Sequence, residues 1–148
     1  KAFGAASRFF HLEFFRLTRA KAGLGEVGDI VALEVNMRPA GGFTPDMLNF
    51  SQSADVYRIW ADMVAFDQQR HTYNGPHRYC VYAGRRDENR YDISLGELEA
   101  RCGNRARLFT RMPDALAGTM GNQVAIACFD CLEDVEDFVQ AAFRLREE

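Results

Sequence analysis

The sequence predicts an α+β protein built on antiparallel sheets with packed helices. Runs of alternating or β-branched side chains near the start of the chain and in its second half are typical of strands. Segments with apolar residues at helical spacing lie between and after these runs. A polar turn containing glycines separates the first two strand-like runs and indicates a hairpin. A second, small α+β unit is expected to follow.

The first two elements are the strands of this hairpin. The aromatic-rich segment Ser7–Phe15 is the first, and the β-branched segment Ile30–Met37 is the second. Between them, Gly23, Gly25 and Gly28 satisfy the GxGxxG pattern of nucleotide-binding loops. A strand follows the last glycine, whereas that motif must open a helix, so left-handed turn geometry is the preferred interpretation and phosphate binding the alternative.

A long segment from Arg38 to Val56 is predicted to be irregular because it contains two prolines and two adjacent glycines. A helix is then expected over Asp55–His71, capped by Ser53 or Asp55. Its apolar stripe is predicted to be core, and comprises Val56, Trp60, Met63 and Val64.

A turn at Tyr73–His77 divides the chain into predicted domains 1–73 and 74–148. The elements expected in the second domain are a strand at Arg78–Arg85, a helix at Ser94–Cys102, strands at Arg105–Arg111 and Gln123–Phe129, and a helix at Leu132–Arg146. Asp130, with Glu133 three positions on, is expected to cap the last helix. Arg85 and Arg86 are interpreted as a charged strand end, with contact to a carboxylate substrate as the alternative.

Composition and charge exclude several classes of protein. The 148 residues are 47% hydrophobic and 26% charged, which is typical of a chain that buries its own core. The formal net charge is −3 and the 18 Lys and Arg residues are scattered, so no nucleic-acid partner is expected. No apolar run approaches the roughly 20 residues of a membrane span, and no series of charged, apolar and small residues marks a signal peptide, so no membrane partner is expected. Because the chain opens on Lys1 without a methionine, we expect it to be part of a longer one.

The cysteines indicate a reducing compartment. Four cysteines spread over half of a chain of this size are expected to be reduced, and the protein is expected to be cytoplasmic. Cys128 and Cys131 form a CxxC, which supplies only half of a zinc site. The preferred interpretation is two small buried residues at a strand-to-helix junction, with redox or metal chemistry as the alternative.

The second strand carries the candidate site. Glu34, Asn36 and Arg38 alternate along it and therefore share one face. If the hairpin closes symmetrically about Leu24 and Gly25, Glu13 lies directly across from Asn36 and diagonal to Glu34. Two carboxylates and an amide oxygen are hard ligands that suit Mg²⁺ bound with substrate phosphates, and an arginine suits a phosphorylated intermediate.

Two further readings of this face stay open. His11 shares the face of Glu13, and either contacts substrate or is simply a packed or solvated residue. The alternative for the whole face is a solvent-facing strand with no site.

Two segments carry a resemblance to a known superfamily. The segment "FHLEFF", followed about twenty residues later by "LEVNMRPAGG", resembles the C-terminal part of ATP-grasp ligases. The likeness extends over roughly Phe3 to Phe66 and is similar to carbamoyl-phosphate-synthetase-like and biotin-carboxylase-like members. It implies an ATP-dependent ligase that joins a small-molecule carboxylate to an amine or thiol.

The resemblance assigns roles to individual residues. It implies that Glu13, Glu34 and Asn36 bind Mg²⁺, and that Arg38 contacts phosphate or the acyl phosphate. Residues assigned to ATP and its closing loop are Glu34, Asn36, Gly41 and Gly42.

The chain departs from the superfamily in what precedes the hairpin. The upstream lobe, with its phosphate-binding lysines, glycine-rich lid and adenine-binding hinge, is not recognisable in this sequence. A fragment is therefore expected, inactive alone and weak in metal binding. The rival hypothesis is a non-catalytic binding or dimerisation module, and a homodimer is compatible with either.

Overall fold

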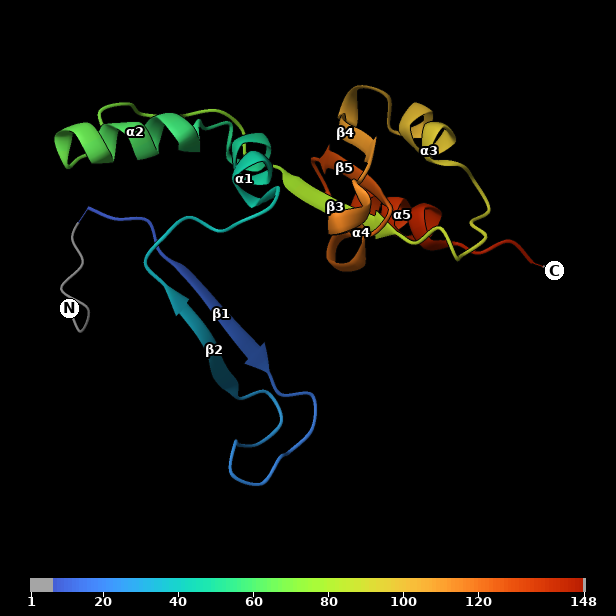
Figure 1. Ribbon diagram of the computed structural model, residues 1–148, viewed down its shortest axis with the longest axis horizontal. Helices are drawn as coiled ribbons and strands as arrows, with labels where there is room; N and C mark the ends of the chain where they lie inside the picture. Colours follow the sequence, from blue (N-terminus) through green and yellow to red (C-terminus); the bar gives the residue numbers. More distant parts are fainter. Residues whose placement is uncertain (1–6, 148) are drawn as a thin grey trace. The chain divides into compact units, whose positions relative to one another are not determined.

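The computed structural model describes residues 7–147, which divide into two compact units (Figure 1). The first unit contains the residues up to Pro45 together with Asp55–Thr72, and the second contains Asp46–Ala54 and the chain from Tyr73 onward. Both sheets are antiparallel and helices accompany them, so the α+β class is confirmed.

The first unit is built on a two-stranded antiparallel ribbon. Strand β1 covers His11–Arg16 and strand β2 covers Ile30–Asn36. The turn between them contains three glycines with positive φ values of 79°, 145° and 94°, at Gly23, Gly25 and Gly28. These backbone angles favour glycine, which accounts for the GxGxxG spacing without a phosphate.

Helix α2 spans Val56–Phe66 and begins as predicted at Asp55, whose carboxylate accepts a hydrogen bond from the Arg58 amide at 3.0 Å. The prediction that its apolar stripe is core is wrong. Trp60 is 52% exposed and Val64 is 68% exposed. Amphipathic spacing identifies the face that favours burial, but burial also requires a partner, and within the described part of this unit that face is left largely to solvent.

The segment after β2 contains a helix that the sequence did not predict. Helix α1 spans Thr44–Gln52, within the stretch expected to be irregular. Pro45 is tolerated there because it lies in the first turn, where its missing N–H has no intrahelical acceptor. Most of α1 belongs to the second unit, within which the Arg78 amide donates to the Ser51 carbonyl and the Ser53 hydroxyl donates to the Pro76 carbonyl, each at 2.8 Å.

The second unit contains a three-stranded antiparallel sheet in the order β3-β5-β4. These strands cover Tyr79–Arg85, Gln123–Phe129 and Ala106–Arg111 respectively. Helices α3, at Leu95–Cys102, and α5, at Leu132–Phe143, pack against this sheet, and a short 3₁₀ turn at Gly103–Arg105 follows α3. The buried cluster comprises Ala83, Leu98, Cys102, Ala125, Ala127, Phe129, Phe138, Ala141 and Ala142.

The ends of two helices in this unit differ in how they are capped. Ser94 and Glu97 form a complete capping box at the start of α3. The predicted cap of α5 by Asp130 is wrong, because Cys131 occupies the N-cap position and makes no side-chain cap. The Asp130 carboxylate instead accepts a hydrogen bond from Arg78 Nε at 3.0 Å.

A further helix, α4 at Asp114–Met120, was not predicted. It has seven residues, which is too short for apolar spacing to identify it. It lies close to the sheet, since the Tyr82 hydroxyl donates to the Met120 carbonyl at 2.5 Å. Across residues 7–147, no helix combines the length and the apolar character needed to cross a membrane.

Candidate functional site

The hairpin brings the two predicted acidic residues directly opposite each other. Glu13 pairs with Glu34, and His11 pairs with Asn36. The predicted register, with Glu13 across from Asn36, is therefore wrong. The turn is not centred on Leu24 and Gly25, because its inner bridge joins Lys21 to Gly25, and the register also shifts after Glu13. Bulges of this kind insert an extra residue into one strand and cannot be located by counting from an assumed turn centre.

Side chains on this face form a connected polar network, which we call the hairpin cluster: His11, Glu13, Glu34 and Asn36. His11 Nε2 lies 2.8 Å from Glu13 Oε1, and Asn36 Nδ2 lies 3.4 Å from His11 Nδ1. A neutral histidine satisfies both contacts if Nε2 carries the proton and donates to Glu13, while Nδ1 accepts from the Asn36 amide. His11 thus links the two strands of the ribbon.

The hairpin cluster stabilises the charged form of one carboxylate. The Asn36 side chain, by hydrogen bonding, holds the pKa of Glu34 below its ordinary value. Desolvation, the second-largest cause, opposes this effect and raises the pKa of Glu34, while His11, Arg38 and Glu13 make smaller contributions that lower it. Glu34 is therefore ionised at neutral pH, as a carboxylate ligand of a cation must be.

Arg38 follows β2 and lies beside a pocket of the same unit. Its guanidinium donates to the Pro39 carbonyl at 3.0 Å. The pocket has a volume of about 460 Å³. It is lined by residues that precede β1, that follow β2 and that belong to α2 or follow it, namely Ser7, Arg8, Phe9, Met37, Arg38, Pro39, Trp60, Met63, Val64 and Asp67. An apolar wall with an arginine at its rim suits a small ligand that carries a negative charge.

The two glycines predicted to contact ATP lie in the loop between β2 and α1. Gly42 has a positive φ of 61°, and the Gly41 carbonyl accepts a hydrogen bond from the Thr44 amide at 3.3 Å. A Cβ added at Gly41 would meet no atom within 4 Å, so packing does not require glycine there. Their assignment to ATP stays a prediction.

The metal-binding prediction rests on two carboxylates and one amide oxygen. Within residues 7–147, no group of three or more His, Cys, Asp and Glu side chains is arranged to hold a metal ion. The hairpin cluster offers the hard oxygen donors that Mg²⁺ prefers, in a number that fits an ion completed by nucleotide phosphates and water. These residues therefore suit an ion whose remaining ligands are nucleotide phosphates and water better than an ion held by protein groups alone.

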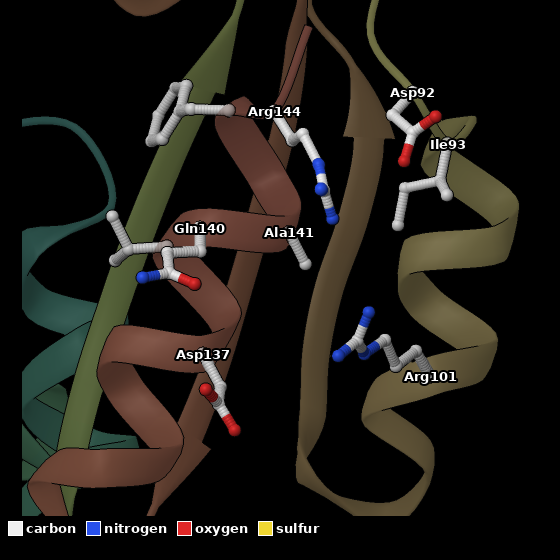
Figure 2. A pocket seen from close by; sticks show the side chains of 9 residues that line it. Asp92, Ile93, Arg101, Asp137, Gln140, Ala141 and Arg144 are labelled. Carbon is white, nitrogen blue, oxygen red and sulfur yellow. The ribbon is translucent and has the colours of Figure 1, made fainter. Parts of the chain in front are cut away.

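A second pocket, of about 580 Å³, lies in the second unit and is shown in Figure 2. Arg101 on α3 and Arg144 at the end of α5 extend toward it, and Asp92 and Asp137 flank it. The lining mixes both signs of charge and contains no nucleophile, so it favours no particular ligand.

The cysteines are all free thiols. Cys128 is buried and Cys131 is exposed, so the predicted pair of buried residues is right for the first and wrong for the second. Cys80 faces Cys128 across β3 and β5. Burial, followed by the neighbouring Cys128 thiol, raises the pKa of Cys80 to about 12, which makes it a poor nucleophile.

Arg85 does end β3, as predicted for a charged strand end. Its burial was not predicted: Arg85 is only 1% exposed, because Tyr91 and Ile93 in the loop before α3 contact its guanidinium. The segment over which the sequence resembles ATP-grasp ligases, roughly Phe3–Phe66, begins outside the described residues, which start at Ser7.

Comparisons with protein-family models, with curated proteins and with solved structures find no match to this chain.

Proposed function

We propose that this chain is the C-terminal part of an ATP-grasp ligase, which joins a small-molecule carboxylate to an amine or thiol with ATP and Mg²⁺. The observation that carries the proposal is the pairing of Glu13 with Glu34 across the hairpin, with Asn36 on the same face. Such an arrangement supports a cation site that is open on one side to phosphate oxygens. It is compatible with the superfamily resemblance of the same two strands.

In this proposal each residue has a separate task. Glu13, Glu34 and Asn36 would hold Mg²⁺, which when bound neutralises charge on the transferring phosphate. Arg38 would bind the acyl phosphate beside the first-unit pocket, before the amine or thiol attacks its carbonyl carbon. Gly41 and Gly42 would lie near ATP in the following loop. The chain alone is expected to be inactive, because the adenine- and phosphate-binding lobe would lie upstream.

The proposed compartment is the cytoplasm. Four free thiols in the described residues support a reducing environment.

The test uses the complete gene product. A coding sequence extended by about two hundred residues upstream, the size of a further domain, should contain a glycine-rich lid and phosphate-binding lysines. In that protein, Glu34→Gln should lower ATP-dependent turnover by about a hundredfold or more with an unchanged melting temperature. The matched control is Glu26→Gln, which removes the same charge from the turn of the same hairpin. Unchanged turnover in Glu34→Gln would refute the site.

A second candidate function is a non-catalytic dimerisation module. The observation that favours it is the exposure of large apolar side chains on both strands of the hairpin, including Leu12, Phe14, Leu33 and Val35. Sedimentation equilibrium tests the module itself: it should dimerise through the hairpin, and Phe14→Ser should then yield monomers. Arg8→Ser, an exposed position outside β1, is the control.

A further inference from the structure

Arg85, at the end of β3, is a buried cation that has no carboxylate partner among residues 7–147. Its Nη2 donates to the Ile93 carbonyl, at 2.5 Å, and its guanidinium stacks on the Tyr91 ring, 3.9 Å from the ring centroid. The remaining donors, Nε and Nη1, are buried and have no hydrogen-bond partner in the part of the chain that the structure describes. An arginine side chain stays protonated in proteins, and a buried charge without a counter-ion is costly. The guanidinium therefore has unused capacity for an anion.

Strand register places two more polar side chains beside Arg85. Arg85 pairs with Gln123 across β3 and β5, and Gln123 pairs with Arg111 across β5 and β4. Directly paired residues in antiparallel strands share a face, so these three side chains form a row across one end of the sheet. The next row on the same face, two residues along each strand, consists of Ala83, Ala125 and Phe109. This face is the one covered by α3 and α5.

The start of α3 lies over this row. A pocket of about 380 Å³ is lined by the row and by the loop that leads into the helix: Arg85, Tyr91, Ile93, Ser94, Leu95, Gly96, Arg111 and Gln123. The first amide groups of a helix have no intrahelical acceptor and attract anions. In α3 the capping box uses the amides of Ser94 and Glu97, which leaves those of Leu95 and Gly96 directed at the N-terminal end.

Two carboxylates near the pocket are already engaged. Asp87 accepts from Arg111 and from Gln123 Nε2, the latter at 2.9 Å, and Glu97 accepts from the Ser94 amide and hydroxyl. The charge of Arg111 is thus matched by Asp87, while Glu97 serves the helix cap. The charge of Arg85 is the one left unmatched among these groups.

We infer that this pocket binds the phosphate group of a small molecule. The donors approach from a guanidinium below, from amides at the helix start and from side chains across the sheet, which suits a tetrahedral oxyanion better than a planar carboxylate. Solvent does not reach Arg85 Nε and Nη1, so the oxyanion contacts them after an exposed lining group moves. Arg111 lines the pocket with a side chain that is 63% exposed, and we take it as the group that moves.

This site is separate from the ligase site proposed above. It belongs to the second unit, whereas the hairpin cluster belongs to the first. The two proposals can therefore fail independently.

The experiment titrates the 148-residue chain with inorganic phosphate and records ¹H–¹⁵N spectra, with sodium chloride at matched ionic strength as the reference. The amides of Leu95 and Gly96 and the side chain of Arg85 should shift with saturation. Equal shifts in chloride, or saturation by acetate without saturation by phosphate, would overturn the inference.

Two variants test the contacts. Arg85→Met should abolish the saturable shift, because it removes the unpartnered guanidinium. Arg111→Gln should weaken phosphate binding by at least about tenfold, because it removes a positive charge from the pocket lining and leaves the Asp87 carboxylate without its cation. Arg107→Gln is the matched control, since Arg107 lies on the same strand as Arg111 and does not line the pocket. If Arg85→Met fails to fold, the comparison of Arg111→Gln with Arg107→Gln decides. Equal affinity in those two variants would contradict the proposed site.

Discussion

Glu13 and Glu34 lie directly opposite each other on β1 and β2, so the ribbon places one carboxylate from each strand on the same face. Like charges at such positions are unfavourable unless other groups compensate. Here His11 contacts Glu13 at 2.8 Å and the Asn36 side chain hydrogen-bonds to Glu34. These contacts make the arrangement open to direct tests.

Asn36→Ala should raise the pKa of Glu34 toward its ordinary value, because the hydrogen bond from Asn36 is the largest cause of the lowering. The measurement is an NMR titration of the Glu34 carboxyl carbon. A group with a lowered native pKa stabilises the fold above its unfolded pKa, and that contribution is lost as pH falls through the native value. The stability difference between the wild type and Asn36→Ala should therefore shrink in acid. Asn104→Ala, in the other unit, is the control, and an unchanged Glu34 pKa in Asn36→Ala would contradict the network.

The histidine tautomers provide a second test. His11 should carry its proton on Nε2 when neutral, because Nδ1 accepts from Asn36 and Nε2 donates to Glu13. His77 should carry its proton on Nδ1, which lies 2.6 Å from the acceptor Gln52 Oε1. Long-range ¹H–¹⁵N spectra above pH 8 distinguish the two forms, with His77 as the internal reference. A proton on Nδ1 of His11 would break the proposed link between the strands.

Gly84 and Gly121 should not tolerate alanine. A Cβ at Gly84 would lie 2.4 Å from the Met120 carbonyl oxygen, and a Cβ at Gly121, where φ is 90°, would lie 2.9 Å from the carbonyl carbon of Gly84. Because both obstacles are backbone atoms, Gly84→Ala should lower the free energy of unfolding by about 1–3 kcal/mol. Gly118→Ala in α4 meets nothing within 4 Å and serves as the control. Denaturant unfolding of the three variants checks the order, and equal midpoints for Gly84→Ala and Gly118→Ala would contradict the close backbone approach.

The four thiols should differ in reactivity. Cys131 is exposed, whereas Cys102 and Cys128 are buried and burial raises the pKa of Cys80 to about 12. A disulfide reagent at pH 8 should therefore modify Cys131 in the folded protein and all four cysteines in denaturant. Cys131→Ser should remove the fast phase. Rapid reaction of Cys80 in the folded chain would show that its strand pair opens readily.

The strands and the longer helices could be predicted because their side-chain periodicity is set by the same residues that pack. The hairpin, α2, α3 and α5 all begin within a few residues of their predicted positions. Helices α1 and α4 could not, since nine and seven residues give too little periodicity to separate a helix from a loop.

Some features of the site could not be predicted, because they depend on the structure of other parts of the chain. The pairing of Glu13 with Glu34 follows from a bulge and from the exact closure of the turn, neither of which changes the alternation along each strand. The burial of Arg85 depends on Tyr91 and Ile93, which follow it in the sequence and contact its guanidinium. His11 could have been weighted more heavily from sequence, because it shares the face of Glu13 two residues away.

Cation binding at the hairpin cluster tests the central claim most directly. Mn²⁺, a paramagnetic substitute for Mg²⁺, should be added with ATP to the ¹⁵N-labelled 148-residue chain, and amide line broadening should be recorded for the wild type, Glu34→Gln and Glu26→Gln. The account predicts weak, saturable broadening centred on Glu13, Glu34 and Asn36, lost in Glu34→Gln and kept in Glu26→Gln. Broadening that is absent from these residues, or that is the same in Glu34→Gln as in the wild type, would contradict it.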